Sequence, residues 1–172
     1  IAGASLVYQQ HFGLTPDRFG LVFGATGVAV LLGAVTSGRL VKRYGVARLA
    51  VGGSFAMAAG AFLALVSAAT SLGLPGIVLG MFVAMWGLGV AESTLMSMAM
   101  ASQHSALGST AALLGAFQLT ISAAATPIAG KIVMLGTEQW LAFILASAGV
   151  LVVLTWLSAR QAPTSLTELA AH

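Results

Sequence analysis

The stretch SGRLVKRYGVAR, residues 37–48, separates two long uncharged runs and carries four of the seven lysines and arginines in the chain. These are Arg39, Lys42, Arg43 and Arg48, and no acid lies among them. Of the 172 residues, 59% are hydrophobic and only 6% are charged, whereas about a quarter of the residues in a soluble domain are charged. So few charges cannot cover a surface that faces water, so we expect most of the chain to lie in lipid.

The same composition argues against several other classes of protein. A formal charge of +3 is far from the many cations and interleaved aromatic rings of a nucleic-acid groove, so no nucleic-acid partner is expected. The absence of cysteine excludes disulfides, thiolate nucleophiles and cysteine metal sites. His11, His104 and His172 are far apart in the sequence. We therefore expect neither a metal site nor a cofactor.

The uncharged runs predict an all-α membrane bundle over residues 1–158. A bilayer core of about 30 Å needs roughly 20 helical residues, and the breaks between runs give five full spans at about 19–41, 49–70, 75–99, 110–130 and 140–158. Residues 1–10 are expected to be the end of a severed sixth helix, because the chain begins with isoleucine inside an apolar run. Residues 159–172 form a polar tail. The runs lack the alternation of a β-barrel strand.

The distribution of cations predicts how the spans are oriented. Loops on the cytoplasmic side carry an excess of lysine and arginine. If the helices alternate in direction, one side receives five cations and the other receives Arg18 and Lys131. The five are Arg39, Lys42, Arg43, Arg48 and Arg160. We therefore expect a multi-pass protein of the inner (plasma) membrane, with the 42–48 loop and the C-terminal tail in the cytoplasm.

Small residues recur at every fourth position in two spans and predict close helix packing. Helices in lipid associate largely through close backbone approach. One stripe holds Ala25, Ala29, Gly33 and Ser37, and another holds Gly52, Ala56, Gly60, Ala64 and Ala68.

The basic stretch also resembles a known signature. GRLVKRYGVAR, from Gly38, is similar to the loop of the major facilitator superfamily, Gly-x-Leu-x-Asp-Arg-x-Gly-Arg-x-Arg. It matches at Gly38, Leu40, Arg43, Gly45 and Arg48. Lys42 replaces the acid of the signature and Val46 a basic residue. Two further stretches, LVYQQHFGLTPDRFGLVFG (6–24) and GSTAALLGAFQ (108–118), resemble the Bcr/CflA group of multidrug efflux transporters.

This resemblance implies a twelve-span drug:proton antiporter, of which the chain would be the end of helix seven and helices eight to twelve. Helices ten to twelve would repeat seven to nine in inverted form. The first half of the transporter would be a missing partner, and protons would drive export and antibiotic resistance. A metabolite or sugar facilitator of the same superfamily, or a structural or assembly fragment, remains an alternative. No second catalytic group accompanies Glu92, so an enzyme is not predicted.

Four residues are candidates for contact with substrate or proton. Glu92 is the one acid clearly inside a span, where an ionised carboxylate costs at least a few kcal/mol. Gln118 lies in the middle of a span, and Met85 and Met96 fall within about 40° of Glu92 on a helical wheel. A carboxylate beside flexible methionines suits lipophilic or cationic drugs. The alternatives are an interhelical hydrogen bond for the polar pair and ordinary packing for the methionines.

Pro127 and Gly130 are candidates for a helix bend. Proline lacks the backbone donor that a continuous helix needs, and such bends help helices to rock in transporters. The alternative is a proline that is merely tolerated near a helix end.

Overall fold

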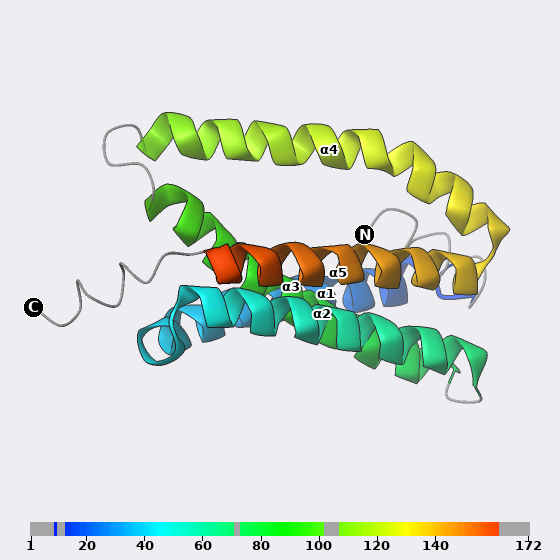
Figure 1. Cartoon of the computed structure of the whole chain (residues 1–172). Helices are drawn as coiled ribbons and strands as arrows, with labels where there is room; N and C mark the ends of the chain where they lie inside the picture. Colours follow the sequence, from blue (N-terminus) through cyan, green and yellow to red (C-terminus); the bar gives the residue numbers. More distant parts are fainter. Residues whose placement is uncertain (1–8, 10–12, 71–72, 102–106, 162–172) are drawn as a thin grey trace, which may run out of the picture.

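The computed structural model describes residues 9, 13–70, 73–101 and 107–161, and its described helices confirm the predicted all-α membrane bundle. They are α1 (Pro16–Tyr44), α2 (Val46–Ala69), α3 (Gly73–Ala101), α4 (Leu107–Leu135) and α5 (Thr137–Gln161). Each is long and apolar enough to cross a bilayer. Successive helices are antiparallel, so that α1, α3 and α5 all end on the same side of the bundle (Figure 1).

The helices extend a few residues beyond the predicted spans. At about 1.5 Å per residue, 29 residues reach roughly 44 Å, which includes the headgroup regions as well as the hydrocarbon core. α5 continues to Gln161, past the expected end at residue 158. The predicted partial helix, apart from Gln9, and the tail from residue 162 lie outside the described residues.

The predicted 42–48 loop is wrong in extent, because only Gly45 interrupts the helices. Its φ of 78° lies in the region that glycine adopts without a steric cost. Its N–H donates to the Val41 carbonyl at 2.9 Å, which closes the end of α1. Lys42 and Arg43 occupy the last turn of α1, where cations interact favourably with the helix dipole. The cations therefore sit on helix ends rather than on a loop.

One end of the bundle carries most of the positive charge, and we call it the basic end. It includes the α1–α2 turn and the end of α5 (Figure 1). The cations there are Arg39, Lys42, Arg43, Arg48 and Arg160. The opposite end carries Asp17 and Glu138, in the first turns of α1 and α5, together with Arg18 and Lys131.

A glycine seam joins α2 to α3 along most of their length. Each seam glycine faces the backbone of the other helix so closely that an added Cβ would lie under 3.0 Å from it. Helices in lipid gain most from such close approach, because van der Waals contact replaces the missing hydrophobic drive. The facing pairs are Gly53 with Ala91, Met57 with Gly87, Gly60 with Ala84, and Ala64 with Gly80.

The predicted small-residue stripes are confirmed in part. In α1, Ala29, Gly33 and Ser37 are buried, whereas Ala25 is exposed. In α2 the predicted stripe begins at the wrong residue, because Gly52 is exposed and Gly53 is buried. The seam positions are spaced alternately by four and three residues, which keeps them on one face of a helix with 3.6 residues per turn.

α3 is the centre of the bundle, since α1 and α2 both pack along it. α5 packs against α2, where the hydroxyls of Ser54 and Thr155 share a buried hydrogen bond of 2.8 Å. Thr155 is 3% exposed and Ser54 is fully buried. This bond fixes how far α2 and α5 slide past each other.

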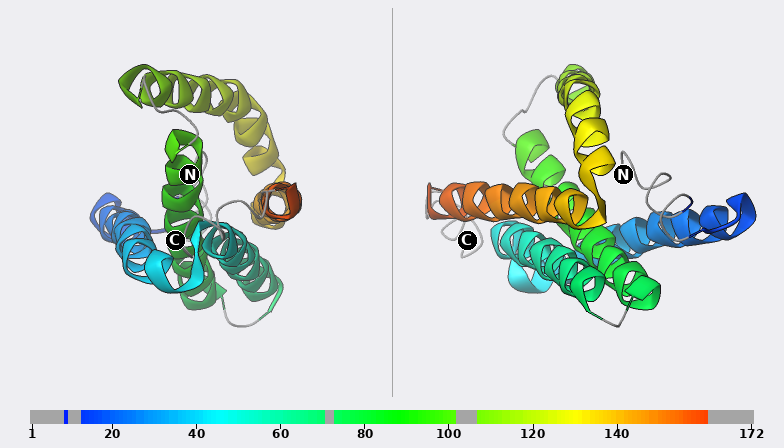
Figure 2. Two further views of the ribbon diagram at one scale, coloured as in Figure 1. Left: turned by 60° about the vertical axis from the view of Figure 1, so that its left-hand side comes forward. Right: turned by 90° about the vertical axis from the view of Figure 1, so that its right-hand side faces the viewer.

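The first part of α4 stands apart from the other helices. No side chain between residues 108 and 128 is buried, whereas Ala129 and Val133 are. Beyond Pro127, α4 turns back toward α5 (Figure 2). There Val133 joins a buried cluster with Ile77, Trp140 and Leu141.

Gly60→Ala is expected to lower the free energy of unfolding by about 1–3 kcal/mol, because its methyl group would overlap the backbone at Ala84. Thermal unfolding of the purified protein in detergent measures this. Gly52→Ala is the matched control, because nothing lies within 4 Å of a Cβ at Gly52. Equal melting temperatures for the two variants would contradict the seam.

Ser54→Ala is expected to lower the free energy of unfolding by about 0.6 to 1.7 kcal/mol, from the average to the maximum found for interhelical hydrogen bonds in membranes. Ser147→Ala should cost less, because the Ser147 hydroxyl donates only within its own helix, to the Phe143 carbonyl. The same unfolding assay compares them. If adding Thr155→Val to Ser54→Ala gave the full sum of both single losses, the two hydroxyls would not be coupled.

Candidate functional site: a cavity between α3 and α4

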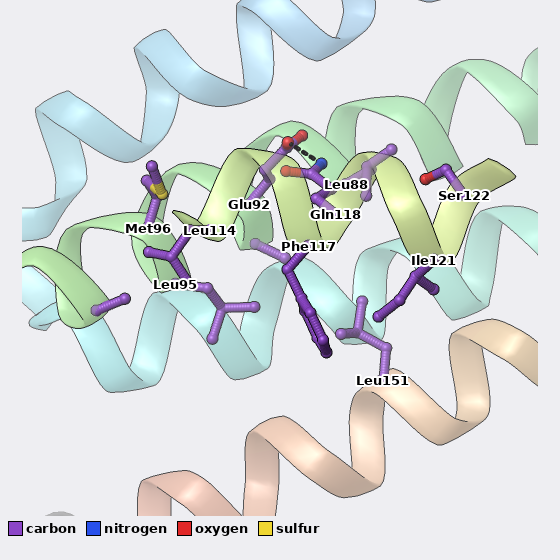
Figure 3. A pocket seen from close by; sticks show the side chains of 12 residues that line it. Leu88, Glu92, Leu95, Met96, Leu114, Phe117, Gln118, Ile121, Ser122 and Leu151 are labelled. Atoms are coloured by element: carbon purple, nitrogen blue, oxygen red, sulfur yellow. Dashed lines mark hydrogen bonds between the residues drawn. The ribbon is translucent and has the colours of Figure 1, made fainter. Parts of the chain in front are cut away.

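An open-sided cavity of about 760 Å³ lies where α4 diverges from α3. Its wall is mainly apolar and comes from α3 and α4, with one residue from α5 (Figure 3). The lining residues are Leu88, Ala91, Glu92, Leu95, Met96, Ala99, Leu114, Phe117, Gln118, Ile121, Ser122 and Leu151.

Glu92 and Gln118 meet across this cavity. The Gln118 Nε2 group donates a hydrogen bond of 2.8 Å to Glu92 Oε1 (Figure 3). α3 and α4 otherwise make little contact, so this bond is a principal link between them. Because the amide is neutral, the bond satisfies one oxygen of the carboxylate without cancelling its charge.

Glu92 lies well inside the helix rather than at its end. It precedes the end of α3 at Ala101 by about nine residues, or roughly 13 Å at 1.5 Å per residue. A carboxylate at such a depth must be wet, protonated or paired with a cation. A cavity is the setting in which all three become possible.

The cavity has a polar side and an apolar side. The Phe117 ring points away from the Glu92–Gln118 pair and toward Leu151 (Figure 3). Ser122 lies one turn beyond Gln118 and adds a third polar side chain. A molecule with one charged or hydrogen-bonding end and one apolar end matches this division.

The two candidate methionines have different surroundings. Met96 lines the cavity, whereas Met85 is 6% exposed and packs in the buried cluster with Met81 and Trp140. The helical wheel cannot separate these positions, because the difference arises from the neighbouring helices.

Pro127 lies inside α4, at the point where burial of this helix begins. Its ring clashes with the carbonyl four residues earlier, which favours a bend. Gly130 has open space where its Cβ would be, so close packing does not require glycine there.

The signature residues of the basic stretch lie outside the cavity. Gly38, Leu40, Arg43, Gly45 and Arg48 are absent from its lining. Their structural part is the turn at Gly45 and the charge of the basic end.

Several lining residues carry no signal in the sequence. Leu95, Leu114, Phe117, Ile121 and Leu151 resemble any other apolar residue of a membrane helix. Ser122 is a polar residue one turn beyond Gln118, and its place in the cavity follows from that spacing. The described residues hold no group of three potential metal ligands, and the three histidines lie outside them.

The chain is similar over 133 residues, with 30% identity, to the uncharacterized MFS-type transporter YdgK of Bacillus subtilis (strain 168). The similarity supports membership of the major facilitator superfamily. The matched region is 76% of this chain and 32% of the relative, so the chain spans about a third of the length of that protein. No family model matches the chain, and no solved structure matches it.

Met96→Cys is expected to react with a water-soluble thiol reagent about tenfold faster than Met85→Cys or more, because only the first position lines the cavity. The chain has no cysteine, so its own residues add no background. Labelling rates in membrane vesicles measure the difference. Equal labelling rates for the two variants would show that position 96 is no more accessible to water than position 85, which would contradict the open cavity.

Proposed function

We propose that this chain is the second-half helical bundle of a major facilitator transporter that exports small molecules by proton antiport. Three observations support the proposal: the similarity to an MFS-type transporter, the five membrane-length helices and the cavity beside Glu92. The cavity is the strongest support for a transport function, because it combines the polar pair Glu92 and Gln118 with an apolar wall at bilayer depth.

In this proposal the cavity between α3 and α4 is part of the substrate site. Its volume of about 760 Å³ lies in the range of small-molecule sites, about 300–1,000 Å³. Glu92 would bind a cationic group, and Gln118 would orient it. Met96 and Phe117 would contact its apolar part. Met85, which lies in the core, is not assigned to this site.

Glu92 would also couple export to protons. An ionised Glu92 accepts the hydrogen bond from Gln118 and attracts a cation. A protonated Glu92 no longer attracts it. Substrate and proton would therefore compete for one carboxylate, which is the requirement for exchange.

The proposed orientation places the basic end in the cytoplasm, as the excess of lysine and arginine there favours. The bundle would rock against the first half of the transporter around the cavity. Pro127, where α4 turns back toward α5, is the proposed site of bending in that motion.

Glu92→Gln in the intact transporter is expected to reduce resistance to cationic drugs by about tenfold or more, because the carboxylate that would pair with the cation is lost. Resistance to neutral drugs should change little. Growth inhibition in cells that express each variant measures both. Glu138→Gln is the matched control, since Glu138 is exposed in the first turn of α5. Equal effects on cationic and neutral drugs would remove Glu92 from the site.

The coupling ion is tested separately in inverted vesicles. Collapse of the proton gradient should stop drug uptake if the transporter is an antiporter. Uptake that persists would instead indicate a facilitator of the same superfamily.

A further inference from the structure

The α2–α5 pair presents cations and aromatic rings together at the basic end. Arg160 is stacked on the exposed ring of Trp156, with its Cζ atom 3.6 Å from the ring centroid. Trp156 is 42% exposed. Stacking occupies the face of the guanidinium and leaves its N–H donors in the plane directed outward, where they match the oxygens of a phosphate.

Arg48 lies at the same level as Arg160. The Ser54–Thr155 hydrogen bond aligns the two antiparallel helices. Arg48 precedes Ser54 by about six residues, and Arg160 follows Thr155 by about five, so both lie roughly 8 to 9 Å from the bond toward the basic end. Figure 1 shows the start of α2 beside the end of α5.

Both arginines are on the side of the α2–α5 pair that faces away from α3. Gly53 packs on α3, whereas Phe55, two positions later, is 55% exposed. At about 100° per residue, Arg48 lies on the side of Phe55. On α5, Trp156 and Arg160 lie roughly 140° and 180° around the helix from Leu151, which lines the cavity beside α3 and α4. The result is a strip in which the rings of Phe55 and Trp156 lie nearer the middle of the helices, and the guanidinium groups of Arg48 and Arg160 lie nearer the basic end.

We propose that this strip, formed by Arg48, Phe55, Trp156 and Arg160, binds one anionic phospholipid. The arginines would hold its phosphate, and the rings would lie along an acyl chain, as tryptophan does at the headgroup level of membranes. The charge is complementary, because the strip has two cations, and the acids of the described residues, Asp17, Glu92 and Glu138, lie elsewhere. This proposal rests on the fold and not on the transported substrate.

The test compares lipid binding to the intact purified protein by native mass spectrometry, with phosphatidylglycerol and phosphatidylcholine as probes. The wild-type protein should retain phosphatidylglycerol preferentially. The double variant Arg48→Gln/Arg160→Gln should bind it roughly 25-fold more weakly, at about fivefold for each cation near the membrane surface. Arg160→Lys should fall between them, since it keeps the charge and loses the planar stacking.

Two matched controls separate a defined site from general attraction. Lys42→Gln/Arg43→Gln removes the same charge from the basic end but on α1, and Arg18→Gln/Lys131→Gln removes it from the opposite end. Both should bind phosphatidylglycerol nearly as well as the wild type. Equal loss in the Lys42/Arg43 variant would overturn the site in favour of diffuse electrostatics. Displacement of the lipid by inorganic phosphate would overturn it in favour of a soluble anion.

A loss of folding is checked in the same samples. The melting temperature of Arg48→Gln/Arg160→Gln without added lipid should match that of the wild type, because both side chains are exposed. Added phosphatidylglycerol should raise the melting temperature of the wild type and not that of the variant. An equal rise in both would contradict the proposal.

Discussion

Close backbone contact between α2 and α3 is the constraint on which the rest of the bundle depends. The hydrophobic effect does not drive helices together inside a membrane, so the bundle must be held by van der Waals contacts and by a few hydrogen bonds. The glycines on both sides of the seam remove the side chains that would keep the two backbones apart. α3 thereby becomes the support for α1 as well, and α2 becomes the support for α5 through the Ser54–Thr155 bond.

The cavity follows from where this packing ends. α4 has no such seam, and its side chains remain unburied until Pro127 has been passed. The divergence leaves a wedge beside α3 in which the polar pair Glu92 and Gln118 can meet. α3 serves both purposes, because one part of its surface forms the seam with α2 and another part lines the cavity, and Ala91 belongs to both.

The sequence predicts the helices well and the site only in part. Length and apolarity determine a membrane helix, so the five spans need no tertiary information. The predicted small-residue stripe of α2 departed from the observed seam, because residues spaced strictly by four drift about 40° per step around a helix. Met85 and Met96 share a helical face, but only the tertiary packing decides which of them is buried. Glu92 and Gln118 were identifiable because polar side chains in a membrane helix require partners.

The single-residue reversal at Gly45 affects how the protein is made. A connection of one residue leaves no soluble linker between α1 and α2, so the two helices form a tight hairpin that favours insertion as one unit. Four cations then flank the tip of that hairpin, and dragging them through hydrocarbon is far costlier than leaving them behind. The cations at the turn therefore favour insertion of α1 and α2 with the turn left on the side of the membrane from which the helices enter.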